Sequence, residues 1–517
     1  MTQCEDNTIY LKPFNAVHMH VEAEDGIEAE LAEAFSFMAE NYRWHPLYRA
    51  RKWDGRIRLY SPRAKKLYRG LESRVEEFAA RNDYKIVNEL RPSPNVPTIE
   101  EAKRYAATVP VNIDPEKNIT HLDPFQQDAV VQALTRERVL LLSPTSSGKS
   151  AIMYALARWY LAKGLRTVII VPSVWLVEQM YGDFVRYAED VDPRFYPPHN
   201  IHRLYEGQAR NFSQPILITT WQTFIKLPLP QIKAFGAIMM DEAHGADAAS
   251  LVKLMEKNDS TPIRLGFTGT LKDTKVHIHT LEGIFGPTYQ VSTTRELMDM
   301  GRVSDLKVIG VVLDHGDVRA ELRAAGYRSN HTLTYPEEQE WIEGCSPRNA
   351  FIARLAATTL ETTTLVLFQH IKHGKEILAH LQTLLESSDV GIHYIDGEVD
   401  VKDRQWIKNS VESSRRNIIL ATYGTMRQGV SIPSIDTLIF ASTTKSKIRS
   451  LQSIGRGLRL KDGKEGCRTY DLMDLIVSGN AKKGPPTCYS LEHGKARMKF
   501  YKDEKFDLEL KKVRLYG

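Results

Sequence analysis

Cysteine is scarce in this sequence. The chain of 517 residues has four, Cys4, Cys345, Cys467 and Cys488, and no two of them form a C-x-x-C pair. Zinc sites and disulfide-rich secreted scaffolds both depend on closely spaced cysteines. We therefore expect neither a zinc site nor a disulfide framework, and the composition favours a protein of a reducing cytoplasm.

Long apolar runs are also missing. No uninterrupted stretch approaches the ~18 residues that a membrane-spanning helix needs. The first seven residues, MTQCEDN, are polar and acidic, unlike the start of a secretory signal. We therefore expect a cytoplasmic protein that makes no use of a membrane.

A surplus of charge of one sign is absent from the chain as a whole, because 69 Lys and Arg face 64 Asp and Glu, a net charge of +5. The segment 49–69 departs from that average, with nine Lys or Arg against the single acid Asp54. Trp53, Tyr60 and Tyr68 are interleaved with these cations. Such a pattern is typical of a surface that binds phosphate backbones and stacks on bases. A solvated basic hairpin with inward-packed aromatic residues is an equally open interpretation.

The domain organisation follows from length and from changes of pattern. With 42% hydrophobic and 26% charged residues the chain is ordinarily globular, and its length favours two or three domains. The three prolines of RPSPNVP, residues 91–97, indicate a linker. The predicted boundaries are an N-terminal basic DNA-binding domain over 1–95, a linker over 96–117, a first lobe over 118–298, a second lobe over 299–475 and a basic helical extension over 476–517.

After residue 118, short β-branched runs alternate with amphipathic helical patterns such as DPFQQDAVVQALTR and SVWLVEQMYGDFVRYA. This alternation indicates a parallel sheet covered by helices, and it restarts after about residue 300. We predict an α/β fold with two tandem parallel-sheet lobes after a small α+β domain. The predicted strands are RVLLLS, TVIIVP, PILITT, AIMMDE and RLGFTG in the first lobe, and DLKVIGVVL, TTLVLFQ, GIHYID, NIILAT and TLIFAS in the second.

The stretch VLLLSPTSSGKSAIM, residues 139–153, joins an apolar run to a helical pattern through a turn of small residues. It matches the phosphate-binding consensus G-x-x-x-x-G-K-[ST], except that Ser143 stands at the first glycine. We predict that Lys149 contacts the β- and γ-phosphates of ATP and that Ser150 ligates Mg²⁺. The backbone N–H groups expected to cradle the phosphates at the helix N-terminus belong to Thr145, Ser146, Ser147, Gly148 and Lys149.

A second apolar run, AIMMDEAH, delivers Asp241 and Glu242 at its end, Asp241 standing 92 residues after Lys149. Ligands sit at the carboxyl ends of strands in open α/β sheets. We predict that Asp241 holds the Mg²⁺ and that Glu242 orients or deprotonates the attacking water. The two motifs together indicate a nucleotide-hydrolysing site.

These motifs resemble those of superfamily 2 helicases, whose core is two RecA-like lobes with ATP between them. In the first lobe, PFQQDA supplies Phe125 and Gln126, which the resemblance assigns to adenine. His244, Thr268 and Thr270 match residues that couple hydrolysis to motion. The segments VPSVWLVEQ and TTWQT match regions that follow a nucleic-acid backbone, and from the second of them we expect contacts by Thr220, Trp221 and Gln222.

The second lobe carries the remaining helicase motifs, LVLFQH, ATYGTMRQGVSIP and LQSIGRGLR. Gln452, Arg456 and Arg459 recur at helical spacing and would share one face, where arginines stabilise charge at the γ-phosphate. The resemblance also implies a nucleotide contact at Gly429 and a DNA contact at Thr422. Ser431 stands where the family often has an acid, which puts a ribose or cross-lobe contact in doubt and leaves the ATPase prediction unchanged.

A wider resemblance, to the recombination helicases of tailed phages, includes NYRWHPLYRARKWDGRIRL, FQHIKHGKEI and TKSKIRSLQSIGRGLR. It implies ATP-dependent work on branched DNA, namely forks, Holliday junctions and R-loops, in recombination, repair and replication, in the host cytoplasm for a phage protein. We expect DNA binding with low sequence specificity, with RNA–DNA hybrids as further substrates. The N-terminal residues expected to contact DNA, with Trp53 as a structural anchor, are Arg51, Lys52, Trp53, Arg56, Arg58, Lys65 and Lys66.

Three other interpretations remain open from the sequence. One is the motor subunit of a restriction or other nuclease assembly, although no P-D…E-x-K cluster is evident. Another is an RNA helicase. The third is a DNA-binding scaffold with a decayed ATPase, against which the intact Lys149, Asp241 and Glu242 argue.

Overall fold

The computed structural model describes most of the chain, and it divides into two compact units. The first holds residues 1–144 and 148–292, and the second holds 145–147 and 293–517. The described residues are 7–113, 119–191, 195–245, 248–271, 274–326, 333–358, 361–397, 407, 410–411, 414, 416–427, 435–442, 453–455, 457–458, 464, 466–477 and 488–515.

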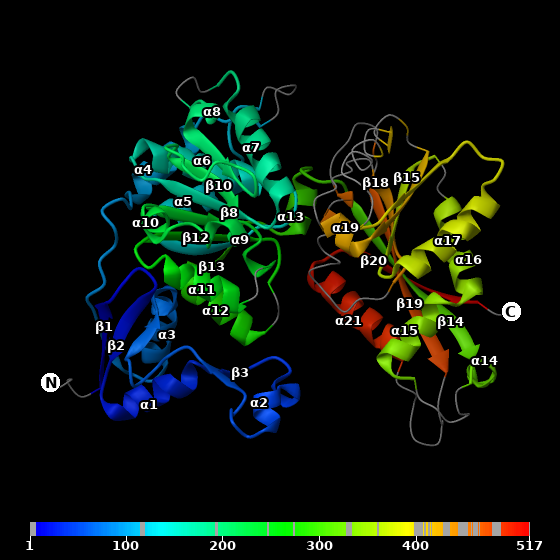
Figure 1. The fold of residues 1–517 in the computed structure, drawn as a ribbon, viewed down its shortest axis with the longest axis horizontal. Coiled ribbons are helices and arrows are strands. Elements are labelled where there is room, and N and C mark those ends of the chain that lie inside the picture. Colours follow the sequence, from blue (N-terminus) through cyan, green and yellow to red (C-terminus); the bar gives the residue numbers. More distant parts are fainter. Residues whose placement is uncertain are drawn as a thin grey trace. The chain divides into compact units, whose positions relative to one another are not determined.

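The first unit begins with a small α+β domain whose four-stranded sheet has the order β5-β2-β1-β6. Alternating apolar residues of β1 and β2, such as Ile9, Leu11, Met19 and Val21, are fully buried against the helices. A two-stranded hairpin, β3-β4, stands apart from this sheet (Figure 1). The elements of the domain are β1 Thr8–Pro13, β2 His18–Glu22, α1 Asp25–Ala34, β3 Ser36–Met38, η1 Tyr42–Trp44, α2 Pro46–Arg49, β4 Arg56–Arg58, β5 Lys66–Tyr68, η2 Arg69–Leu71, α3 Glu72–Arg81 and β6 Lys85–Asn88.

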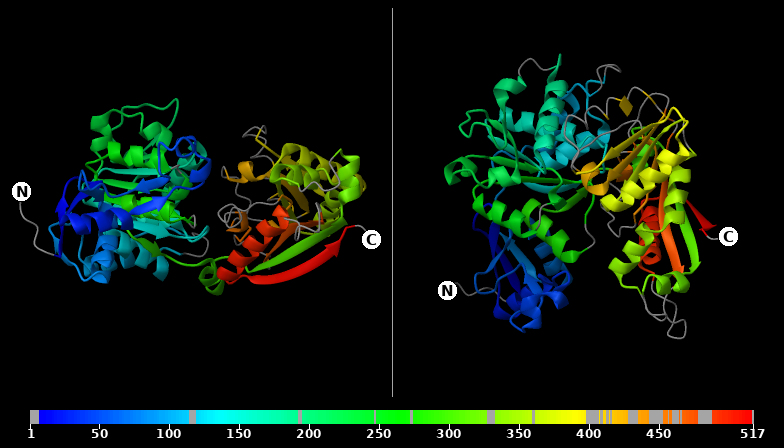
Figure 2. Two further views of the ribbon diagram at one scale, coloured as in Figure 1. Left: turned by 90° about the horizontal axis from the view of Figure 1, so that it is seen from below. Right: turned by 45° about the vertical axis from the view of Figure 1, so that its right-hand side comes forward.

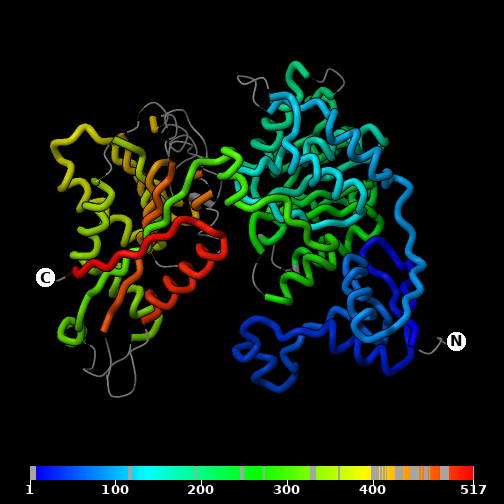
Figure 3. Tube along the Cα trace, turned by 180° about the vertical axis from the view of Figure 1, so that it is seen from behind, coloured from blue at the N-terminus to red at the C-terminus, as the bar shows by residue number. Residues whose placement is uncertain are grey.

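This domain packs directly on the first lobe. A Cβ added to Gly70 in η2 would lie 2.1 Å from the carbonyl oxygen of Glu282 in α12 (Lys275–Phe285), so only glycine permits that approach. The guanidinium of Arg74 pairs with the Glu282 carboxylate at 3.1 Å, and Arg69 pairs with Glu137 at 3.0 Å. The connecting chain after β6 runs along the outside of the unit (Figure 3). The N-terminal domain and the first lobe therefore belong to one unit.

The first lobe is a seven-stranded sheet in the order β13-β7-β12-β11-β8-β10-β9, and every neighbouring pair is parallel. Its central strands are buried on both faces because helices cover both (Figures 1 and 2). Its strands are β7 Arg138–Leu142, β8 Thr167–Val171, β9 Ile201–Leu204, β10 Ile216–Thr220, β11 Ala237–Met240, β12 Ile263–Thr268 and β13 Thr288–Gln290. Its principal helices are α4 Ile99–Thr108, α5 Pro124–Leu134, α6 Lys149–Ala162, α7 Val174–Ala188, α11 Ala248–Lys257 and α12.

The second lobe is another seven-stranded sheet, in the order β16-β17-β15-β18-β19-β14-β20, again parallel throughout. Its strands are β14 Leu306–Asp317, β15 Thr363–Phe368, β16 Gly391–Ile395, β17 Asn417–Thr422, β18 Ile435–Phe440, β19 Cys467–Val477 and β20 Asp507–Arg514. Its main helices are α15 Tyr335–Glu343, α16 Ser346–Ala357, α17 Ile371–Leu384 and α21 Tyr489–Asp503.

The predicted fold class, two parallel-sheet lobes after a small α+β domain, is confirmed, and each of the ten predicted strands is present. Four further strands of the two lobes were not predicted. Three of them lie at sheet edges, where the sequence is too polar or too short to give a continuous apolar run, namely β9, β13 and β20. The fourth, β19, lies between β18 and β14, and its sequence mixes polar with apolar residues.

The C-terminal segment differs from its prediction. Residues 476–517 were expected to form a helical extension, and α21 does lie there. Residues 507–514, however, form β20, which pairs with β14 along its length (Figure 2, left). The alternating sequence DLELKKVR suits an edge strand with one face toward solvent, so the chain end completes the second sheet. Among the described residues, no helix combines the length and the apolar character needed to cross a membrane.

Candidate functional site

The phosphate-binding motif lies where β7 ends and α6 begins, at the carboxyl edge of the first sheet. Gly148 caps α6 with φ +78°, in the left-handed region that favours glycine, and Ser146 also has a positive φ of 69°. Ser143, at the consensus's first glycine, has no positive φ and donates its backbone N–H to the carbonyl oxygen of Thr268 at 2.8 Å. This backbone position therefore needs no glycine.

Lys149 and Glu242 meet at this edge. The Lys149 Nζ lies 3.0 Å from Glu242 Oε1, and both side chains are largely buried. Burial lowers the pKa of Lys149, but the charges of Glu242 and then Asp241 outweigh it and raise that pKa above its ordinary value. Lys149 therefore stays charged, as an ammonium that contacts phosphate must.

Asp241 lies beside this pair and is itself buried. Its Oδ1 atom makes no hydrogen bond with any described residue. Burial raises the pKa of Asp241 to about 6, Lys149 opposes that rise, and Glu242 adds to it. A buried carboxylate oxygen without a partner is costly, so this atom fits a site that receives a cation.

Ser150, the second predicted Mg²⁺ ligand, has its Oγ 2.8 Å from the hydroxyl of Tyr187 in α7. A serine that donates its proton to Tyr187 keeps both oxygen lone pairs for a metal. Among the described residues, no group of three or more His, Cys, Asp and Glu is arranged to hold a metal ion. Mg²⁺ in nucleotide sites uses one or two protein ligands together with phosphates and waters, so the donors Asp241 and Ser150 fit it. Tyr187 was not predicted, because nothing in its local sequence distinguishes it from a core aromatic residue.

A chain of polar contacts leads from Glu242 away from the phosphate loop. Glu242 has a φ of 48°, which is strained for a residue other than glycine, and its Oε2 lies 3.3 Å from His244 Nδ1. His244 Nδ1 lies 2.6 Å from Thr268 Oγ1, and that hydroxyl donates to the carbonyl oxygen of Thr270 at 2.9 Å. The three residues predicted to couple hydrolysis to motion are therefore contiguous with the predicted water-activating carboxylate.

Gln126 also reaches the loop. Its Oε1 accepts the backbone N–H of Asp123 at 3.0 Å in a capping box at the start of α5. A Cβ added to Gly148 would lie 2.3 Å from Gln126 Nε2, so the amide touches the glycine of the phosphate loop. Phe125 is half-buried and packs against the first-lobe core. An adenine contact by Phe125 and Gln126 stays a prediction. Both residues lie on α5, the helix that adjoins the phosphate loop.

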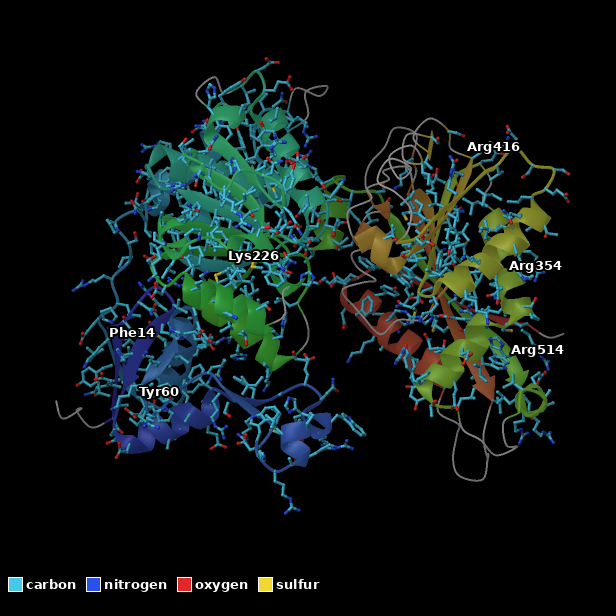
Figure 4. All side chains as sticks on the ribbon, viewed as in Figure 1. Phe14, Tyr60, Lys226, Arg354, Arg416 and Arg514 are labelled. Carbon is cyan, nitrogen blue, oxygen red and sulfur yellow. The ribbon has the colours of Figure 1, made fainter. Side chains whose placement is uncertain are left out.

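A pocket of about 340 Å³ opens near the ends of β8, β9 and β10 in the first lobe. Thr220 and Gln222, predicted to follow a nucleic-acid backbone, line it. Thr220 is buried and donates its hydroxyl to Thr223 at 3.0 Å, whereas Trp221 packs against the lobe's core. The pocket also has cationic and polar residues that the sequence analysis missed, Gln208, Arg210 and Lys226 (Figure 4 labels Lys226).

The predicted cations of the N-terminal domain have different surroundings. Lys65 pairs with Glu28 at 2.8 Å, and Arg58 pairs with Asp54. Lys66 Nζ lies 3.8 Å from the ring centre of Phe14, which lies in the N-terminal domain (Figure 4). Of the predicted cations, three are exposed and make no ion pair with any described residue, namely Arg51, Lys52 and Arg56.

The aromatic residues interleaved with these cations pack inward. Tyr60 is fully buried (Figure 4) and donates its hydroxyl to the carbonyl oxygen of Val21 at 3.0 Å. Tyr68 stacks on His18, their ring centres 4.8 Å apart. Trp53 is half-buried and donates its indole N–H to the carbonyl oxygen of Arg56 at 2.9 Å. Neither Tyr60 nor Tyr68 therefore offers an open face to a base.

In the second lobe, Thr422 lies at the carboxyl end of β17, where its Oγ1 is 2.7 Å from Thr425 Oγ1. The other predicted second-lobe residues lie outside the described part of the chain. These residues are Gly429, Gln452, Arg456 and Arg459.

Comparisons with known proteins give three family matches. The N-terminal region of the DNA helicase UvsW matches residues 8–89, the res subunit of type III restriction enzymes matches 119–273, and the helicase conserved C-terminal domain matches 348–461. The putative ATP-dependent helicase IRC3 of Saccharomyces cerevisiae is 26% identical over 104 residues, which is 20% of this chain and 15% of that protein.

Two solved structures are also similar. The crystal structure of T4 UvsW is 30% identical over 98% of this chain and 100% of its own, with a TM-score of 0.49. The type ISP restriction-modification enzyme LlaBIII bound to DNA has a TM-score of 0.55 at 14% identity, over 86% of this chain and 36% of its own, which indicates a shared fold alone.

The ATP-dependent DNA helicase uvsW of Enterobacteria phage T4 matches nearly the whole chain. The two chains are 32% identical across 96% of this chain and 98% of that protein. A match of this identity over nearly the whole of both chains, together with the helicase motifs, establishes that this chain belongs to the family of UvsW DNA helicases.

Proposed function

We propose that this chain is an ATP-driven DNA helicase that remodels branched DNA, namely forks, Holliday junctions and R-loops, in recombination, repair and replication. The single observation that carries the proposal is the buried arrangement around Lys149. Its ammonium pairs with Glu242 at the sheet edge where nucleotides bind in such folds. Beside this pair lies the Oδ1 of Asp241, which has no hydrogen-bond partner in the described part of the chain. The host cytoplasm is the proposed location, because the relative named above is a phage protein.

Each residue of the site has a proposed role. The phosphates of ATP compete with Glu242 for the Lys149 ammonium, and the released carboxylate is then free to orient the attacking water. Backbone N–H groups of residues 145–149 cradle the phosphates at the start of α6. Asp241 and Ser150 would hold Mg²⁺, which when bound neutralises charge on the β- and γ-phosphates.

Coupling to motion is proposed to run through His244. When ATP takes Lys149 away from Glu242, the Glu242 carboxylate that faces His244 loses its charge partner. His244 in turn contacts Thr268 at the end of β12. Thr268 in turn holds the backbone of Thr270. This chain of contacts supports a role in which the state of the nucleotide changes the backbone that follows β12.

From the sequence motif, we further propose that Gln452, Arg456 and Arg459 of the second lobe complete the site by facing the γ-phosphate. ATP would then be held by groups from both lobes, and hydrolysis would release one set of contacts. Gly429 is proposed to contact the nucleotide from the same lobe.

DNA contacts are proposed for the first-lobe pocket, for Thr422 and for the N-terminal cations. The pocket's Thr220, Gln222, Arg210 and Lys226 offer hydroxyl, amide and cationic donors, which bind phosphate and sugar without reading sequence. The predicted result is binding of low sequence specificity whose affinity falls steeply as salt rises.

The decisive test compares ATP hydrolysis in the presence of single-stranded DNA, duplex, fork, four-way junction, RNA–DNA hybrid and single-stranded RNA at fixed salt. Stimulation is expected to be strongest with forks and junctions. A Glu242→Gln variant should still bind ATP and branched DNA, measured by filter binding, while losing hydrolysis.

Three results would change the proposal. Stimulation by single-stranded RNA alone would favour an RNA helicase. DNA cleavage in the presence of Mg²⁺ and ATP, using purified protein, would favour the motor of a nuclease assembly. Equal stimulation by blunt duplex and by fork would remove the preference for branched DNA and leave the ATPase.

A further inference from the structure

Residues 36–58 form an arm, made of β3, η1, α2 and β4, that stands apart from the main sheet of the N-terminal domain (Figures 1 and 3). The base of the arm is held against α12 of the first lobe. The rings of Phe37 and His279 lie 4.5 Å apart, and Thr274 donates its hydroxyl to Glu40 at 2.8 Å. The arm therefore has a fixed attachment to the ATP-binding lobe.

The arm is ordered by its own aromatic residues. Tyr42 and Tyr48 meet edge to face with ring centres 4.9 Å apart, and His45 meets Trp53 in the same way at 5.1 Å. Gly55 has φ +80°, and a Cβ there would lie 2.7 Å from the Tyr42 ring. These contacts account for the aromatic residues of the arm with one exception.

The exception is Trp44, whose side chain is 72% exposed, the largest value for any large hydrophobic residue in the described part of the chain. Leu47, nearby on the same surface segment, is 48% exposed. The guanidinium carbon of Arg49 lies 5.5 Å from the Trp44 ring centre, a cation–π contact that helps to hold the indole in place. The folded arm thus presents a largely exposed indole with the Arg49 guanidinium over its ring.

The net positive charge of the arm indicates which kind of partner binds this surface. The arm contains six Lys or Arg, namely Arg43, Arg49, Arg51, Lys52, Arg56 and Arg58, against the two acids Glu40 and Asp54. A polyanion is attracted to such a surface, and nucleic acid is the polyanion whose bases also stack on aromatic rings. Duplex ends and branch points expose the base faces that such stacking requires.

We infer that Trp44 is a stacking site for a nucleobase exposed at a DNA branch point, with the cations of the arm holding the adjacent phosphates. The inference rests on the proposed function, and it names the part of branched DNA that this arm recognises. Base stacking on one aromatic side chain contributes about 1–3 kcal/mol, so loss of the indole should weaken binding to forked DNA by about 5- to 150-fold.

The test compares Trp44→Ala and Trp44→Phe with Tyr196→Ala, which removes a 55% exposed aromatic residue elsewhere in the same unit. Dissociation constants are measured for a fork and for a hairpin-capped duplex across a series of salt concentrations. Trp44→Ala should lose fork affinity while keeping capped-duplex affinity and the slope of log K against log salt, because it removes no charge. Trp44→Phe should restore most of the affinity, and Tyr196→Ala should match the parent.

The double variant Arg51→Ala with Lys52→Ala tests the basic DNA surface separately from the stacking site. It should weaken binding to both DNAs and reduce the salt slope by about 2. Unchanged fork affinity in Trp44→Ala, with weakened binding in the double variant, would overturn the stacking site and leave the basic DNA surface intact. Unchanged binding in both would remove the DNA role of this arm altogether.

A second readout reports on stacking itself. 2-Aminopurine placed at the branch point should lose fluorescence when the parent protein binds, because stacking quenches it, and should lose much less with Trp44→Ala at saturating protein. Equal quenching by both proteins would overturn the inference. ATP hydrolysis without DNA should be the same in the parent, the Trp44 variants and Tyr196→Ala.

Discussion

Both lobes bury carboxylates at their parallel sheets, but the hydrogen bonding of these carboxylates differs between the two lobes. In the first lobe, Asp241 keeps one oxygen that has no hydrogen-bond partner among the residues that the structure describes. In the second lobe, Asp474 accepts from Arg348 at 2.7 Å and from His315 at 2.8 Å, and Ser490 is a third partner at 3.1 Å. Asp471 is enclosed in the same way by Arg497 and Tyr501.

The difference distinguishes a ligand-binding site from a buried network that only stabilises the fold. A satisfied buried network stabilises one arrangement of the chain and has no capacity left for a ligand. A buried oxygen left without a partner costs free energy, so the first lobe retains at Asp241 a feature that folding alone disfavours. We therefore propose that the carboxylate that holds Mg²⁺ during ATP hydrolysis belongs to the lobe that carries this cost.

The largest expected effect is on ATP hydrolysis. Lys149→Ala and Asp241→Asn should each reduce the hydrolysis rate by at least about 10²- to 10³-fold. Lys149 is proposed to contact the phosphates directly, and Asp241 is proposed to hold the Mg²⁺ that neutralises their charge. Steady-state hydrolysis with forked DNA measures this. A Lys149→Ala protein as active as the parent would contradict the assignment of the site.

Removal of the Asp474 carboxylate in the second lobe should instead lower the free energy of unfolding. Asp474→Asn leaves Arg348 buried with a weakened partner, and breaking a buried ion pair costs about 3–5 kcal/mol. Urea denaturation should show this loss, whereas Asp241→Asn should change the free energy of unfolding by about 1 kcal/mol or less. Equal destabilisation by the two substitutions would abolish the distinction between the lobes.

The phosphate loop gives a smaller effect with a matched control. Gly148→Ala places a side chain at φ +78° and 2.3 Å from Gln126 Nε2, so ATP affinity should fall by about 10-fold. Gly164→Ala has a similar φ of +72° but meets nothing within 4 Å. It should therefore incur the backbone cost alone and leave ATP affinity unchanged, as measured by equilibrium binding.

The smallest effect is the dependence of second-lobe stability on pH. Burial lowers the pKa of His315, but hydrogen bonds to Asp474 and Cys345 outweigh it and raise the pKa to about 9. The folded state then binds more protons than the unfolded state between pH 6.5 and 9, so this contribution is complete below pH 6.5 and is lost as pH rises. Burial and then Arg348 lower the pKa of His373 to about 3, which reduces stability as pH falls below 6.5.

The second lobe should consequently be most stable near pH 6.5. Melting temperatures measured from pH 6.5 to 9.5 should fall for the parent protein. His315→Gln should have a lower melting temperature throughout and a flatter decline, since it lacks the titrating ring; a parallel decline in both proteins would assign the pH dependence to other groups.

Much of the fold was predictable because the first-lobe strands and most second-lobe strands are local apolar runs with turn residues at their ends. Edge strands such as β20 were missed, since pairing on one side only leaves them polar. In the candidate site, Lys149, Glu242 and Asp241 were predicted because each follows a recognisable strand. Tyr187 and Lys226 were not, because single residues of a helix and a loop carry no motif of their own.

The sequence by itself determined the order of strands and helices and the positions of the phosphate loop and the acidic pair, because these depend on periodicity and on the chemistry of neighbouring residues. The tertiary structure alone decided which buried polar groups find partners. Arg74 meets Glu282 across 208 residues and Ser150 meets Tyr187 across 37. Such encounters depend on how sheets and helices pack, and packing determines whether a buried carboxylate is enclosed, as Asp474 is, or left with an open oxygen, as Asp241 is.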